Sequence, residues 1–146
     1  MKEITIDGVT YSLTPKEEIK QETKLPKTWE ELEDIEGYFV KSSSVVSNFS
    51  TCDAVLRNKN IFATKEQAEA SIALAQLSQL LKVYRGGWLP DWKDDNYKYA
   101  IQFSQDVLEI SSLVCSNAFI TLPTKELAKE FLNNFSELIL KAKPLL

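Results

Sequence analysis

The feature that most constrains the fold is a helix-start motif that occurs twice, each time at nearly the same distance from a tyrosine. Tyr38 is followed 26 residues later by Thr64 in the string TKEQA, and Tyr99 is followed 25 residues later by Thr124 in TKELA. Threonine is a good N-cap because its hydroxyl accepts a hydrogen bond from a backbone N–H that the first helical turn leaves unpaired. Each motif therefore predicts a long helix directly after it.

Strand-prone sequence lies between each tyrosine and its threonine, over 44–49 in the first half and 107–115 in the second. A short apolar segment, 61–63 or 119–122, directly precedes each cap. Two strand-strand-strand-helix units related by internal duplication explain this pattern, and convergence on a common helix start is the alternative. We predict an α+β fold with two long helices and a mostly antiparallel sheet of about five to seven strands.

The N-terminal region has its own two signals. Residues 3–13 alternate apolar and polar side chains around Asp7-Gly8, the kind of dipeptide that most strongly indicates a two-residue hairpin turn. A threonine and a glutamate three residues apart then form a capping-box pattern, which predicts a short acidic helix over 28–36 that ends at Gly37. We interpret the acidic residues of this helix as a solvated face.

We predict one domain over 1–146, in which a first β-α unit spans 37–85 and a second spans 97–143. A chain of 146 residues buries roughly two-thirds of its unfolded surface in one core, so it needs no disulfide or metal to fold. The only cysteines are Cys52 and Cys115, and we expect both to be reduced and packed.

The two predicted helices differ in their apolar faces. The helix over 125–141 has one apolar face, as expected of a helix that lies on a core. The helix over 65–84 has a broad apolar stripe and a second, smaller stripe that includes Ile72, Ala75 and Val83. The smaller stripe either contacts the chain's own core, which we favour, or forms an interface with another subunit or partner.

Composition excludes several classes of protein. The chain has no histidine, so the commonest general base and zinc ligand are missing. It also lacks a glycine-rich phosphate loop and a nucleophile-elbow motif. The net charge of −4 argues against a protein that binds duplex nucleic acid. We therefore expect no enzyme activity, no catalytic residue, no cofactor and no metal.

The most distinctive segment is 86–99, with the sequence GGWLPDWKDDNYKY. Aromatic side chains beside polar groups anchor protein interfaces or stack on bases and sugars, but they also close over a core. We predict that Trp88 packs near the end of the helix and that Trp92 stays partly exposed. The candidate binding surface consists of Trp88, Asp91, Trp92, Asp94, Asp95 and Tyr97.

Four strings in this part of the chain, FATKEQA, AQLSQL, GWLPDW and the final AKPLL, are similar to a known family. Over about 37–146 the chain resembles small, uncharacterised proteins encoded by phages and prophages of gut anaerobes. The resemblance implies a viral accessory protein in the bacterial cytoplasm or associated with the virion. It supplies no activity and no catalytic residues.

These observations favour a non-enzymatic module that binds a host or phage protein, with a homodimer as another arrangement. We expect no membrane association, because the start of the chain is charged and the longest apolar run is short. One alternative is a nucleic-acid-associated accessory protein that acts through 37–146, where the charge is no longer acidic. The other is a carbohydrate-binding module that uses the tryptophans.

Overall fold

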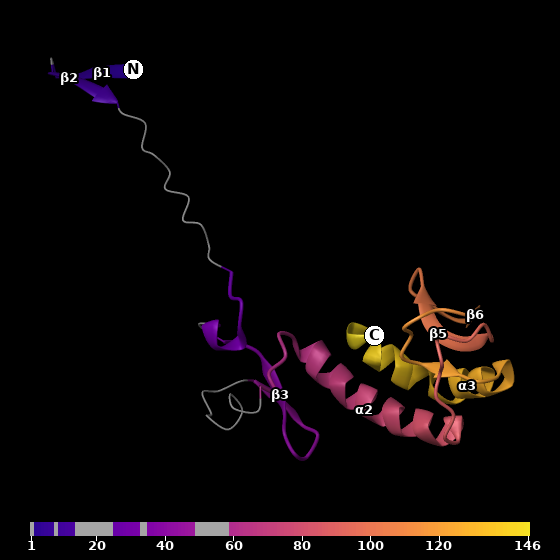
Figure 1. Cartoon of the computed structure of the whole chain (residues 1–146). Helices are drawn as coiled ribbons and strands as arrows, with labels where there is room; N and C mark the ends of the chain where they lie inside the picture. The colour runs from indigo at the N-terminus through magenta and orange to yellow at the C-terminus, as the bar shows by residue number, and fades with distance from the viewer. Residues whose placement is uncertain (1, 8, 14–24, 33–34, 49–58) are drawn as a thin grey trace. The chain divides into compact units, whose positions relative to one another are not determined.

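The computed structural model has the predicted α+β class, with two long helices and antiparallel strands (Figure 1). The contacts divide the chain into two units, Met1–Ile35 and Glu36–Leu146, where the sequence predicted one domain. In the first unit, the side chains of Leu25 and Leu32 are exposed. The residues that the structure describes are 2–7, 9–13, 25–32, 35–48 and 59–146.

The first unit begins with the predicted hairpin. Strands β1 (Lys2–Ile6) and β2 (Val9–Leu13) pair antiparallel, with Ile6 opposite Val9. Asp7 has a φ of 52°, which a residue in a two-residue turn of this kind needs and which aspartate tolerates. The hairpin prediction is confirmed.

The predicted helix over 28–36 is wrong. Of the described residues in this range, 28–32 and 35–36, only Trp29–Glu31 is helical, as a single 3₁₀ turn (η1), and the Thr28 side chain makes no capping bond. Instead, the backbone N–H of Lys27 donates to Glu31 Oε2 at 2.9 Å. No residue of the turn is buried, so no packing offsets the unfavourable nucleation of a longer helix.

The second unit opens with a small antiparallel pair, β3 (Tyr38–Val40) and β4 (Val46–Asn48). Tyr38 also forms a β-bridge with Phe62, with N···O distances of 2.8 and 2.7 Å. Gly37 makes this approach feasible, because a Cβ there would lie 2.2 Å from the carbonyl oxygen of Phe62. Gly37 thus serves a close backbone contact and does not end a helix.

Helix α2 (Lys65–Arg85) follows the bridge and has the predicted capping box. Thr64 Oγ1 accepts from the backbone N–H of Gln67 at 3.1 Å, and Gln67 Oε1 accepts from the backbone N–H of Thr64 at 3.3 Å. The helix ends at Gly86, whose left-handed conformation (φ 55°) is a common C-cap. Both ends of α2 are therefore set by local sequence.

The larger sheet is formed by β5 (Lys98–Ser104), β6 (Val107–Leu113) and β7 (Thr121–Leu122), in the order β6-β5-β7. All its pairings are antiparallel. Gln105 and Asp106 form the turn between β5 and β6, and both have positive φ, as a type I′ hairpin turn requires.

Helix α3 (Lys125–Ala142) packs beside α2 and against this sheet, and a 3₁₀ turn, η2 (Lys143–Leu145), follows it (Figure 1). Thr124 caps α3 by accepting from Leu127 N at 3.3 Å. The buried side chains between the two helices and the sheet form one core. They include Leu77, Leu81, Ile101, Ile120, Leu122, Phe131 and Ile139.

The described strands form three small sheets and not the single sheet that the sequence predicted. The two halves of the second unit nevertheless share a strand order. Tyr38 lies between β4 and Phe62 in the first half, as Tyr99 lies between β6 and Leu122 in the second. The third strand of the first half is reduced to one bridge. Internal duplication stays a prediction.

Candidate functional site

The aromatic loop, which we define as residues 86–97, connects α2 to β5. It leaves the helix through two successive glycines with positive φ, Gly86 (55°) and Gly87 (90°). The backbone N–H of Trp88 then donates to the carbonyl of Arg85 at 2.9 Å. The predicted candidate surface therefore lies on one loop whose exit from the helix is fixed by its glycines.

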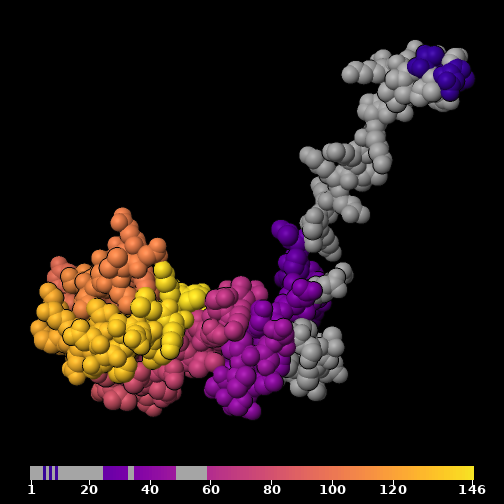
Figure 2. Space-filling view, turned by 180° about the vertical axis from the view of Figure 1, so that it is seen from behind, coloured from indigo at the N-terminus to yellow at the C-terminus, as the bar shows by residue number. Residues whose placement is uncertain are grey.

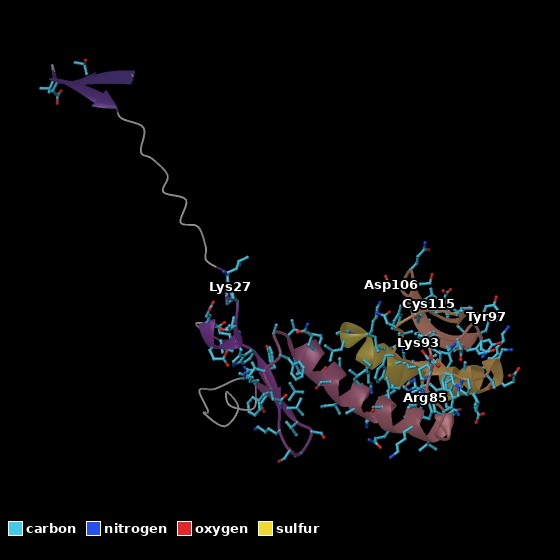
Figure 3. All side chains as sticks on the ribbon, viewed as in Figure 1. Lys27, Arg85, Lys93, Tyr97, Asp106 and Cys115 are labelled. Atoms are coloured by element: carbon cyan, nitrogen blue, oxygen red, sulfur yellow. The ribbon has the colours of Figure 1, made fainter. Side chains whose placement is uncertain are left out.

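Arg85 ties the start of the loop to β7 and to the segment before it. Its Nε donates to the Thr121 carbonyl at 2.8 Å and its Nη2 donates to the Phe119 carbonyl at 3.1 Å. Burial lowers the pKa of this guanidinium from its ordinary value, because it disfavours the charged form. Arg85, Lys93 and Tyr97 mark the start, middle and end of the region in Figure 3.

Two of the loop's acids shape its backbone. Asp91 Oδ1 accepts from the backbone N–H of Lys93, and Asp94 Oδ1 accepts from the backbone N–H of Asn96, each at 2.9 Å. Both are turns in which an aspartate bonds the backbone two residues on. Asp95 is exposed, as is Asp91. Among the described residues, no group of three or more acidic or cysteine side chains could hold a metal ion.

The anchor of the loop is Lys98, the first residue of β5, which the sequence analysis did not single out. Its side chain is 3% exposed, yet its ammonium donates to Asp94 Oδ1 and, at 2.8 Å, to the Asn96 carbonyl. The ammonium also lies 5.4 Å from the centre of the Trp92 ring, within the range of a cation–π contact. The hydrogen bond from Lys98, followed by that from Asn96 N–H, lowers the pKa of Asp94.

The aromatic side chains do not show the contrast that we predicted. Trp88 and Trp92 are both half-buried, so Trp92 is partly exposed as expected but Trp88 is not fully packed. The most exposed large apolar side chains of the loop are Leu89 (75%) and Tyr97 (64%). Leu89 therefore belongs to the candidate surface, although the sequence did not predict it there.

The candidate interface on α2 lies largely in solvent. Ala75 is exposed, Val83 is 76% exposed and Ile72 is half-buried. Our preference for a core contact is therefore wrong for Ala75 and Val83. The reason is that α3 packs on the broad apolar stripe, while no described element covers the smaller stripe at these two positions. An interface with another subunit stays a prediction.

A cavity lies at the edge of β5, and the sequence did not predict it. This cavity of about 350 Å³ is lined by Ile101, Gln102 and Phe103 of β5, by Ser116, Asn117, Ala118 and Ile120 of the following segment, and by Leu146. It forms where β7 is too short to continue along β5. Because the lining residues come from three separate parts of the chain, no short stretch of sequence predicts the cavity.

The cysteines divide between the described and undescribed parts of the chain. Cys115 is an exposed free thiol, so the expectation that it is packed is wrong, while Cys52 lies outside the described residues. Among the described residues, no helix has both the length and the apolar character needed to cross a membrane.

Comparison with protein-family models, with curated proteins and with solved structures found no match to this chain.

Proposed function

We propose that the chain is a non-enzymatic module that binds another protein through the aromatic loop. The observation that carries the proposal is the exposure of Leu89 and Tyr97 on a loop whose backbone is held by Lys98 and by two aspartate turns. A rigid loop that presents apolar side chains loses little conformational entropy on binding, which favours affinity. The partly open indoles of Trp88 and Trp92 would extend the contact.

The electrostatics of the loop support a protein partner over the two alternatives. Asp91 and Asp95 are exposed beside the aromatic side chains and would repel a phosphate backbone. The ammonium of Lys98 lies over the Trp92 ring, where it competes with a stacked sugar. An apolar centre with an acidic rim suits a protein surface that carries apolar and basic side chains.

We also propose that this partner is a host or phage protein in the bacterial cytoplasm, in line with the family resemblance of residues 37–146. Site-specific photocrosslinking tests the binding surface. A photoreactive phenylalanine analogue at Leu89 or Tyr97 should crosslink one defined protein in a bacterial lysate. The same analogue at Leu140, an exposed apolar position on α3, should not crosslink that protein.

Substitution completes the test. In this test the photoreactive analogue is placed at Trp92. The double variant Leu89→Ser, Tyr97→Ser should no longer crosslink the partner, whereas the control variant Leu140→Ser should still crosslink it. Thermal melts should show both variants folded, because these side chains are exposed. Equal capture by the two variants would exclude the loop as the binding surface. Quenching of tryptophan fluorescence by an oligosaccharide, abolished by Trp92→Ala, would support the carbohydrate alternative instead.

A further inference from the structure

The outer edge of β6 is a strand edge of seven residues with which no described strand pairs. In the sheet order β6-β5-β7, β5 is the one described strand that pairs with β6. Its register with β5 runs from Val107 to Leu113 without a bulge, and the strand contains neither proline nor lysine. Proteins commonly protect an exposed edge with one of these features. The β5–β6 hairpin forms the orange part of the surface in Figure 2.

The hydrogen-bond pattern shows which groups this edge presents. The backbone N–H of Ile101 donates to Ile120 at 2.9 Å, so residues of β5 with odd numbers bond toward β7 and those with even numbers bond toward β6. In β6, the residues that pair with these even-numbered residues of β5 have odd numbers. The N–H and C=O groups of Leu108, Ile110 and Ser112 therefore point away from β5.

We propose that this edge pairs with the same edge of a second copy of the chain, as an antiparallel dimer centred on Ile110. In this register Ile110 faces the partner's Ile110, and Leu108 faces the partner's Ser112. Each of these pairs exchanges two backbone hydrogen bonds, so every outward group of the three residues finds a partner. The two three-stranded sheets join into one continuous sheet.

The side chains of β6 are self-complementary in this register. On the face away from α3, the exposed Val107 meets the partner's Leu113, and Glu109 meets the partner's Ser111. Glu109 is the only charged residue of the strand, and it does not lie directly opposite its own copy. A shift of the partner by two residues places the two Glu109 side chains opposite each other, which is unfavourable. The position of Glu109 and the pairing of Val107 with Leu113 therefore favour this register. They also favour a second copy of the chain as the partner of the edge.

Light scattering of the full chain across a broad concentration range tests the dimer. The wild type should be dimeric at high concentration. Ser112→Pro removes an outward N–H that bonds none of the residues that the structure describes, and proline is tolerated at such edge positions. It should weaken the dimer by roughly thirtyfold or more, because both copies lose a bond. Ser112→Thr keeps the N–H and should stay dimeric.

Disulfide trapping tests the register, and it decides the proposal if Ser112→Pro fails to fold. In chains with Cys52→Ser and Cys115→Ser, a mixture of Glu109→Cys and Ser111→Cys chains should crosslink efficiently under mild oxidation. Either chain alone should crosslink poorly, because its cysteines lie diagonal to each other. Equal crosslinking in all samples would overturn the register.

Two outcomes would overturn the dimer itself. One is a wild type that stays monomeric at every concentration. The other is a dimer that folded Ser112→Pro leaves unchanged, which would place self-association elsewhere, for example at Ile72, Ala75 and Val83.

Discussion

Replacement of Lys98 by methionine separates the role of its charge from that of its stem. Lys98 is 2% exposed, so its stem is packed and methionine fills a similar volume. The substitution removes the charged donor from the Asn96 carbonyl and the cation from the face of Trp92. The side chain of Asp94 is 40% exposed, so water replaces much of the contact that its carboxylate loses.

The loss can be estimated from the two remaining contacts. A hydrogen bond from a charged donor contributes about 1.5 kcal/mol, and a cation–π contact adds about 0.5 kcal/mol. We expect Lys98→Met to lower the free energy of unfolding by about 2 kcal/mol and the melting temperature by about 5 °C. Tryptophan emission should shift to longer wavelength, because Trp92 loses the group that holds it. Chemical denaturation followed by fluorescence measures the free energy and the emission shift, and a thermal melt measures the melting temperature.

The matched control is Lys93→Met, which removes an exposed lysine from the same loop. Its side chain bonds none of the described residues, so this variant should keep wild-type stability and emission. If Lys98→Met behaves like Lys93→Met, then the buried ammonium does not hold the loop. The proposed function would then lose the rigidity on which its affinity depends.

Three further predictions concern single positions. Thr64→Ala should cost about 1 kcal/mol of unfolding free energy through loss of the cap, whereas Thr64→Ser should not, as measured by thermal melts. The folded pKa of Asp94 is lowered, so its contribution is present above the unfolded value of about 4 and is lost as pH falls through the folded pKa. The stability advantage of wild type over Asp94→Asn should therefore shrink in acid, as denaturant titrations at several pH values would show. Val83→Glu should leave the unfolding free energy within about 0.5 kcal/mol of wild type, because the side chain is exposed. A large loss of unfolding free energy would mean that this face of α2 packs on the core.

Elements whose signals lie within a few residues could be predicted from the sequence. The first hairpin and the caps at Thr64 and Thr124 form as expected. In each case the groups that bond are separated by only a few positions, so the chain needs no distant partner. The predicted helix at Thr28 shows the limit of such signals, because its cap pattern had no core to pack on.

The candidate site was found only in part for a related reason. The aromatic loop is conspicuous in the sequence because its tryptophans, tyrosines and aspartates are neighbours. Its anchor is not conspicuous, because Lys98 is a strand lysine whose burial depends on how Trp92 and Asp94 fold over it. The exposure of Leu89 likewise follows from the direction in which the loop leaves α2.

The sequence by itself determined the α+β class, the ends of the long helices and the first hairpin, all through contacts between near neighbours. Only the tertiary structure decided that the described strands form three sheets, that Val83 faces solvent and that no described strand pairs with the outer edge of β6. Strand pairing joins backbone groups that every residue carries, so the choice of partner depends on which distant segments meet. That choice is made by packing around Leu77, Phe131 and the rest of the shared core, which no local stretch of sequence contains.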